Sequence, residues 1–236
     1  SDSGAYFLQM SFALKGTLDI DCFHSAWEEI VKRHEILRTA FVQEGLPEPL
    51  QVILKHRPPA FLVEDISSLP TTEQHRKISD FCALDKERGF DLKEDSLVRF
   101  AVFRLDSKRH QVIWSYHHIL LDGWSLGNLY KEFHRLYGAR VTGSISQVPP
   151  VRQFSHYVDW LQYFDANKAR AFWGERLKGV EQVTSIPILP GSQPEEEYRM
   201  GEITFQLTEE LSRAVAELAQ QSGVTVSTLM QVAWAV

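Results

Sequence analysis

Residues 111–125 read QVIWSYHHILLDGWS. Residues 111–117 have the composition and period of a β-strand, in which every second side chain points to the same face. The Leu-Leu-Asp-Gly segment that follows predicts a turn, and a helical apolar pattern begins near residue 125. The stretch therefore predicts a strand, a turn and a helix, with two adjacent histidines where the strand ends.

The two histidines at the end of this strand suggest acid–base chemistry. Extended backbone sends His117 and His118 in opposite directions, so only one of them can face a given channel. A neutral imidazole, with a pKa near ~6.5, is the usual general base at neutral pH. Asp122 can orient such a ring or hold the loop through an ion pair. Gly123 can bring the backbone close to a substrate and donate an N–H to a developing oxyanion.

Other interpretations of the same residues stay open at this point. A lone histidine before a turn is more often structural than catalytic. A metal site is a rival, but His117, His118 and Asp122 supply too few well-spaced ligands. No serine or cysteine lies in a GxSxG pattern, which would mark a nucleophile that forms an acyl-enzyme. If the site catalyses group transfer, we therefore expect one substrate to attack the other directly.

The composition excludes several classes of protein. The chain has 236 residues, 44% hydrophobic and 24% charged, which is enough for a real hydrophobic core. A net charge of -6 without a lysine–arginine cluster argues against nucleic-acid binding. Cys22 and Cys82 form no CxxC pair, no apolar run reaches ~20 residues, and the N-terminus lacks a signal peptide. The sequence predicts a cytoplasmic domain that binds neither nucleic acid nor membrane.

Elements expected toward the N-terminus alternate between strands and helices. Arg99 interrupts one face of the strand expected over 97–105. The expected elements are a strand over 6–14, a helix from Asp19 or Asp21 to about Arg38, short strands at 51–54 and 60–63, an amphipathic helix over 73–88, and a strand over 97–105.

Elements expected toward the C-terminus fall into two groups, separated by a proline-rich and acidic stretch at 179–200. Before it we expect a helix near 125–137, a loop, and a long helix over 153–178. After it we expect a strand over 201–207, a helix over 208–221 capped by Thr208, and a last helix from about 227. That helix ends apolar and uncapped at Val236, which predicts that the chain is truncated.

Three motifs together resemble a known family. Residues 117–123, HHILLDG, match the HHxxxDG motif of nonribosomal peptide synthetase condensation domains, and Trp124-Ser125 matches its usual continuation. Residues 33–41, RHEILRTAF, match the family motif RHExLRTxF. Residues 157–160, YVDW, resemble YxDF with tryptophan in place of phenylalanine. Their order and rough spacing extend the resemblance over essentially the whole chain.

The resemblance implies an α/β fold, with a mixed sheet and helices packed on it, in a chloramphenicol-acetyltransferase-like lobe. Two such lobes face each other across a tunnel in this family. Residues 1–178 would form the N-terminal lobe, 179–200 a crossover linker, and 201–236 the truncated beginning of the C-terminal lobe. The remaining motifs of the C-terminal lobe are missing.

The resemblance also implies a reaction and its partners. The reaction is amide-bond formation between a donor acyl or peptidyl thioester and the α-amine of an acceptor aminoacyl thioester. The implied partners are upstream and downstream peptidyl carrier proteins, an adjacent adenylation domain and the missing C-terminal lobe. No cofactor would be bound by this domain, because the substrates are carried on 4'-phosphopantetheine. The alternatives are an epimerisation domain of the same superfamily and a non-catalytic recruitment domain.

Individual roles follow from the motif by resemblance. His118 would be the catalytic residue, either accepting a proton from the attacking amine or positioning that amine. His117 would be structural. Gly123 would permit a tight turn and donate its N–H to the thioester oxygen.

Four further residues complete the candidate site. In this family the aspartate of HHxxxDG points away from the tunnel and pairs with an arginine. Asp122 is therefore expected to pair with Arg38, with Arg33 as the alternative. Trp124 and Ser125 are tunnel candidates. Trp124 is equally a core candidate, and Ser125 is equally a candidate N-cap of the following helix.

Overall fold

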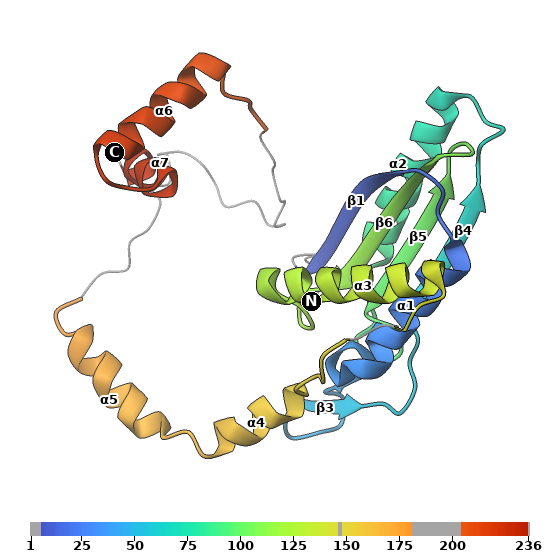
Figure 1. The fold of residues 1–236 in the computed structure, drawn as a ribbon. Helices are drawn as coiled ribbons and strands as arrows, with labels where there is room; N and C mark the ends of the chain where they lie inside the picture. The colour runs from blue at the N-terminus through green and yellow to red at the C-terminus, as the bar shows by residue number, and fades with distance from the viewer. Residues whose placement is uncertain (1–5, 146–147, 181–203, 236) are drawn as a thin grey trace, which may run out of the picture. The chain divides into compact units, whose positions relative to one another are not determined.

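A computed structural model describes residues 6–145, 148–180 and 204–235 (Figure 1). The chain divides into two compact units, residues 1–183 and 184–236, which are described separately. The first unit contains, in chain order, β1 (Phe7–Lys15), α1 (Ile20–Arg33), the 3-10 helix η1 (Glu35–Arg38), β2 (Thr39–Val42), β3 (Leu50–Ile53), β4 (Ala60–Asp65), α2 (Thr71–Arg88), β5 (Val98–Arg104), β6 (Arg109–His117), α3 (Gly123–Thr142), α4 (Phe154–Gln162) and α5 (Ala166–Arg176).

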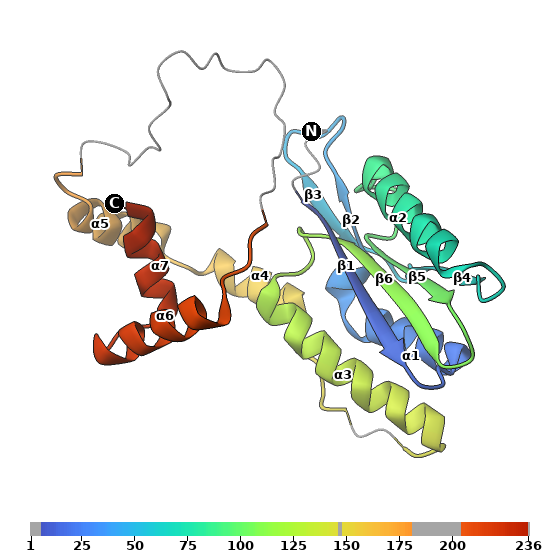
Figure 2. The same ribbon diagram turned by 90° about the horizontal axis from the view of Figure 1, so that it is seen from above.

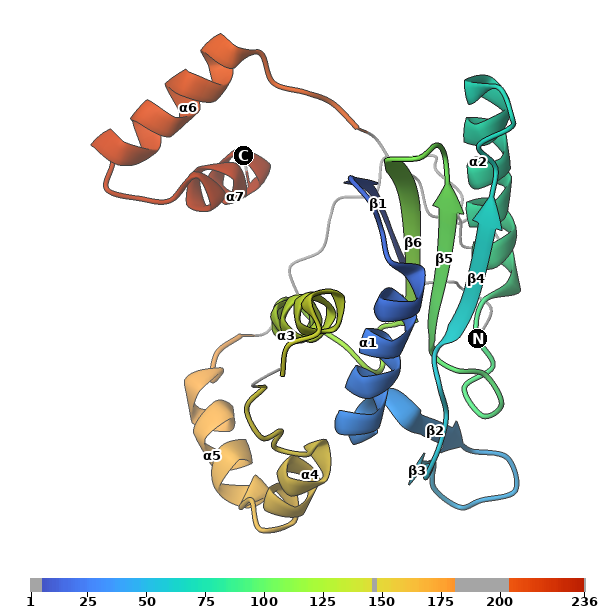
Figure 3. The ribbon, with the colours of Figure 1, turned by 45° about the vertical axis from the view of Figure 1, so that its right-hand side comes forward.

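A four-stranded sheet in the order β1-β6-β5-β4 carries the first unit. β6 is antiparallel to both β1 and β5, whereas β4 and β5 are parallel. Parallel neighbours need a crossover connection, and α2 supplies it. Figures 2 and 3 show α2 on one face of the sheet and α1 with α3 on the other. The predicted α/β class, a mixed sheet with helices on it, is confirmed.

The alternation along the central strands decides which residues meet each helix layer. Val112, Trp114 and Tyr116 of β6 pack in the larger core cluster with α1 and α3, while Ile113 packs in a second cluster under α2. Strands that are covered by helices on both faces carry apolar side chains on both faces, as β5 and β6 do. By the same period of two, His117 at the end of β6 lies on the α2 face.

The helix expected to reach Arg38 ends five residues earlier. α1 begins after Asp19, whose side chain accepts a hydrogen bond from the Cys22 N–H, as predicted. It stops at Arg33 because His34 is extended, with φ −104° and ψ 103°, and a short 3-10 helix follows. The predicted C-terminal end of this helix is therefore wrong.

The long helix expected over 153–178 is two helices. α4 ends at Gln162 and α5 begins at Ala166. Asp165 starts the second helix as an N-cap, accepting hydrogen bonds from the N–H groups of Asn167 and Lys168. The single helix that we expected is therefore interrupted before Asp165. The periodicity of the apolar residues gives no sign of this N-cap.

The second unit contains α6 (Glu209–Gln221) and α7 (Val226–Ala235). Thr208 caps α6 through the Leu211 N–H, as predicted. A strand was expected over 201–207. The described part of that segment, residues 204–207, forms no strand. Most of the expected linker, residues 181–200, lies outside the described residues. Every described helix is too short or too polar to cross a membrane.

Candidate active site

The backbone of the histidine pair is fixed by the neighbouring strand. β6 ends at His117, which pairs with Phe7 of β1. The His118 N–H donates to the Tyr6 carbonyl at 2.8 Å, and the Leu120 N–H donates to the His117 carbonyl at 3.1 Å. A tight turn therefore follows directly on the strand and presents His118.

The two imidazoles lie in different surroundings. His118 is exposed, and its side chain makes no hydrogen bond to another described residue. His117 is half-buried between the rings of Tyr6 and Phe90, with centroids 5.9 and 6.1 Å away. Its Nδ1 accepts the Ile119 N–H at 3.1 Å. Burial, and to a lesser extent the neighbouring His118, lower the pKa of His117, so its ring is neutral at pH 7.

A cavity of about 440 Å³ lies where His118 is presented. Its walls come from residues 34–37, 118–122, 125, 128, 129 and 152–154. His118, Asp122 and Ser125 therefore share one cavity, while Gly123 and Trp124 are not among its lining residues. The cavity is large enough for part of a small-molecule substrate.

Asp122 is the N-cap of α3. Its Oδ1 accepts hydrogen bonds from the Ser125 N–H at 2.8 Å and from the Ser125 hydroxyl at 2.6 Å. These bonds hold the pKa of Asp122 below its usual value. Ser125 is therefore not the N-cap of this helix but the partner of the cap.

The predicted ion pair of Asp122 with Arg38 is wrong. Neither residue occurs in the ion pairs between described residues, and Arg38 instead donates to the Leu54 carbonyl. Arg33, the alternative, pairs with Glu132 at 2.5 Å. The physical reason is local: a short carboxylate at a helix start satisfies the free N–H groups beside it, and the end of α1 at Arg33 changes where Arg38 points.

The RHEILRT motif braces the wall of the cavity. His34 and Arg33 both contact the carboxylate of Glu132 in α3, at 2.8 and 2.5 Å. Gln153 accepts the Glu35 N–H at 3.2 Å and donates to the Arg33 carbonyl at 2.9 Å. Sequence reasoning missed Glu132 and Gln153, since neither belongs to a motif.

Glu35 of the same motif makes a further contact, with the start of α4. Its carboxylate accepts the Ser155 N–H at 2.7 Å. Burial acts to raise the pKa of Glu35, but the hydrogen bonds from Ser155 outweigh it and the pKa is lowered. The carboxylate is therefore ionised at pH 7 and ties the start of α4 to η1.

The structure contradicts the turn role expected for Gly123 and excludes one of the two interpretations of Trp124. Gly123 is the first residue of α3 and has no positive φ, and apart from its chain neighbours and the backbone of its own helix no atom lies within 4 Å of the position that a Cβ would take. The turn therefore does not require glycine there. Trp124 is 88% exposed, which excludes the core interpretation.

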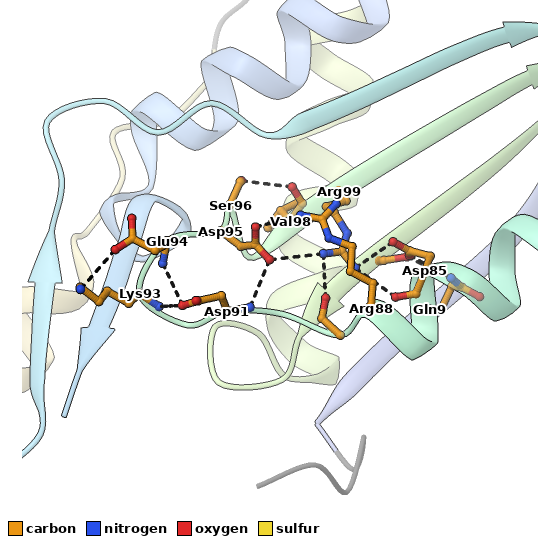
Figure 4. A network of polar contacts seen from close by, with 12 residues as sticks. Gln9, Asp85, Arg88, Asp91, Lys93, Glu94, Asp95, Ser96, Val98 and Arg99 are labelled. Carbon is orange, nitrogen blue, oxygen red and sulfur yellow. Dashed lines mark hydrogen bonds and ion pairs between the residues drawn. The ribbon is translucent and has the colours of Figure 1, made fainter. Parts of the chain in front are cut away.

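A polar network behind His117 was also missed. Asp85 of α2 pairs with Arg99 of β5 at 2.8 Å, and both side chains are buried. The carboxylate also accepts from Gln9 at 3.1 Å (Figure 4). It accepts from the Ser115 hydroxyl at 2.5 Å as well. The one available signal was Arg99, a charge in the middle of an apolar strand.

Removing the Asp122 cap should weaken the start of α3. We expect Asp122→Ala to lower the thermal unfolding midpoint, and Asp122→Asn to retain most of it, since asparagine also caps helices. Because the folded pKa is lowered, the carboxylate contributes stability above its unfolded pKa and loses it as the pH falls through the folded value. Melting curves from neutral to acid pH test this; equal midpoints for the two variants would contradict it.

Comparison with known proteins decides the family. The sequence profile described as "Condensation domain" matches residues 1–236. The chain belongs to the condensation-domain family. Its curated relatives include two proteins of Bacillus licheniformis, bacitracin synthase 1, 37% identical over 98% of this chain, and bacitracin synthase 3, 33% identical over 98%. These are nonribosomal peptide synthetases, so the predicted family is confirmed.

Solved structures show the same fold. SgcC5 of Streptomyces globisporus superposes with a TM-score of 0.73 and 24% identity, over 97% of this chain and 52% of that one. An epimerization domain of tyrocidine synthetase B gives 0.69 with 19% identity, over 79% of this chain and 43% of the other. The condensation-domain chain thus spans about half of these structures, and 4% of each of the two bacitracin synthases.

Among the described residues, no three histidine, cysteine or acidic side chains form a cluster that could hold a metal ion. The rival metal interpretation of His117, His118 and Asp122 is therefore not supported by their geometry. The Asp122 carboxylate already accepts a hydrogen bond from the Ser125 hydroxyl, and the Nδ1 of His117 accepts one from the Ile119 N–H.

Proposed function

We propose that this condensation-domain chain carries the catalytic residue for amide-bond formation between a donor acyl or peptidyl thioester and the α-amine of an acceptor aminoacyl thioester. The observation that carries the proposal is the divergence of the HHxxxDG histidines. His118 is exposed at the cavity, while His117 is turned away and hydrogen-bonded.

The chemistry is direct transfer between the two substrates. The amine nitrogen attacks the thioester carbonyl, the C–N bond forms, the C–S bond breaks, and the donor arm leaves as a thiol. The amine loses one proton, which the imidazole of His118 can accept and return to the leaving thiolate. No cysteine lines the cavity, and the Ser125 hydroxyl is engaged by Asp122, which supports transfer without an acyl-enzyme.

The developing oxyanion needs a hydrogen-bond donor. Gly123 provides the first N–H of α3, one of the helix-start groups without an intrahelical acceptor. It is adjacent to Asp122, which lines the cavity. We assign Gly123 this role, and we assign Trp124, exposed beside it, to the wall of the tunnel.

The partners follow from the family and the reaction. Upstream and downstream peptidyl carrier proteins deliver the two substrates on 4'-phosphopantetheine arms, and an adjacent adenylation domain loads the acceptor. The C-terminal lobe supplies the opposite wall of the tunnel. The domain itself binds no cofactor, because the thioesters are already activated.

Epimerisation is the second candidate, because an epimerization domain superposes on this chain with a TM-score of 0.69. The two reactions differ in the need for an acceptor amine. An epimerase inverts the α-carbon of one carrier-bound residue and forms no bond between substrates.

The test uses a polypeptide that contains this chain together with the rest of the condensation domain. Donor and acceptor carriers are loaded separately, mixed with it, and the acceptor-bound species is identified by mass spectrometry. We expect an amide on the acceptor carrier and no inverted donor when the acceptor is omitted. Inversion of the donor without an acceptor would show that the domain is an epimerase. If neither an amide nor an inverted donor forms, a non-catalytic recruitment domain is favoured.

A further inference from the structure

One buried carboxylate ties three strands together on the α2 face of the sheet. Ser115 of β6 lies opposite Gln9 of β1 and Arg99 of β5 in the strand registers. Asp85 accepts a hydrogen bond from each of these side chains, and Figure 4 shows Gln9 and Arg99 beside it. The strand end that carries the histidines is thereby fixed two residues upstream of His117.

The partner of this carboxylate reaches from the sheet to the loop after α2. Arg99 donates to the Gly89 carbonyl at 2.8 Å, and its guanidinium carbon lies 3.9 Å from the centre of the Phe90 ring. Its Nε–H has no hydrogen-bond partner among the described residues. The contact with the ring therefore contributes to placing the guanidinium, as cation–π stacking does.

Phe90 in turn contacts the first histidine of the motif. Its ring stands nearly perpendicular to the His117 imidazole, at 83° and 6.1 Å between centroids. Nδ1 of that imidazole accepts the Ile119 N–H. This bond requires an unprotonated Nδ1, so the neutral ring carries its hydrogen on Nε2. The same turn presents His118.

The cost of burying Arg99 and Asp85 indicates a role other than stability. Their side chains are 8% and 7% exposed. Well-packed apolar residues usually stabilise a fold as well as a buried ion pair does, whereas a charged pair fixes geometry. Here the geometry that it fixes is the position of Phe90 against His117.

We propose that Phe90, held by Arg99, is a positioning residue that orients the His117 ring and, through it, the turn that presents His118. Its effect on the reaction passes through His117 and the Ile119 N–H. The proposal rests on the proposed function for its kinetic consequence, but not for its structural one.

The test variant is Phe90→Leu, which keeps an apolar side chain but removes the aromatic ring. Phe81→Leu is the matched control, because Phe81 packs on the same sheet face against Phe103 at 5.4 Å. Two readouts are needed: kcat and KM for amide formation in a polypeptide containing the whole condensation domain, and imidazole ¹⁵N shifts of His117 in the 236-residue chain.

We expect Phe90→Leu to lower kcat about tenfold, with KM changed less than about twofold, since misplacement of a reacting group acts on the chemical step. The ¹⁵N shifts of His117 should move from one Nε2–H tautomer toward an average of two. Phe81→Leu should lower the unfolding midpoint but leave both readouts unchanged. Equal readouts for the two leucine variants would overturn the proposal.

Two further outcomes separate this proposal from the proposed function. If the wild-type protein forms no amide but Phe90→Leu still changes the His117 tautomer, the proposed function fails and the positioning role stands. If Phe90→Leu does not fold, Arg99→Lys replaces it, because lysine keeps the charge beside Asp85 but cannot stack as a planar group. Unchanged kcat and tautomer in a folded Arg99→Lys variant would overturn the positioning role.

Discussion

His118→Ala should lower the rate of amide formation by about 10²- to 10⁴-fold, the range typical of a lost acid–base group. The substitution should leave the fold intact, since the His118 side chain is exposed and makes no hydrogen bond to another described residue. Single-turnover product analysis by mass spectrometry gives the rate, and thermal unfolding monitored by circular dichroism gives the stability.

The neighbouring histidine supplies the matched control. His117→Ala removes a half-buried ring and the acceptor of the Ile119 N–H. We expect it to lower the unfolding midpoint more than His118→Ala does, and to lower the rate less. Condensation at the wild-type rate in His118→Ala would show that the catalytic assignment is wrong.

Asp85→Ala should have the largest effect on stability, a loss of roughly 3–5 kcal/mol in the free energy of unfolding. The variant leaves Arg99 buried without a compensating carboxylate and removes an acceptor from Ser115 and Gln9. Urea unfolding measures the loss. Glu64→Ala is the control, because its pair with Lys77 is partly exposed and such pairs contribute at most about 1 kcal/mol.

A double variant separates the cost of a stranded charge from the loss of packing. Asp85→Leu with Arg99→Met should recover much of the stability lost in Asp85→Ala, since neither charge is then buried. If Asp85→Ala costs no more than Glu64→Ala, the Asp85–Arg99 pair is not buried in solution.

The sheet was largely predictable because its strands have local signatures. The alternation over 111–117 and the apolar run over 97–105 are properties of short segments, and β5 and β6 form there. β2 was not predicted, since it follows directly on a helix-like motif and pairs with β3 eight or more residues away. Pairing of that kind depends on the turn between the strands.

The candidate site was predicted in position but not in all its contacts. Strand alternation separated His117 from His118, and their surroundings in the structure differ accordingly. The Asp122–Arg38 pair failed because a helix cap satisfied the carboxylate locally, and because the end of α1 depends on contacts of His34 with α3.

The polar network around Asp85 could not be predicted from local sequence patterns. Arg99 and Ser115 lie 14 and 30 positions from Asp85 along the chain, and their meeting depends on the crossover through α2 and on strand register. Arg99 alone gave a signal, as a charge in a buried strand. A buried arginine requires a partner, but its identity emerges only from the fold.

The most direct measurement is a single turnover with an isotopically labelled donor, in a polypeptide that contains this chain and the rest of the condensation domain. We predict that the label passes from the donor carrier to an amide on the acceptor carrier, that none becomes covalently attached to the domain, and that in His118→Ala it stays on the donor carrier. Label attached to the domain, or amide formed at an unchanged rate in His118→Ala, would contradict direct transfer at His118.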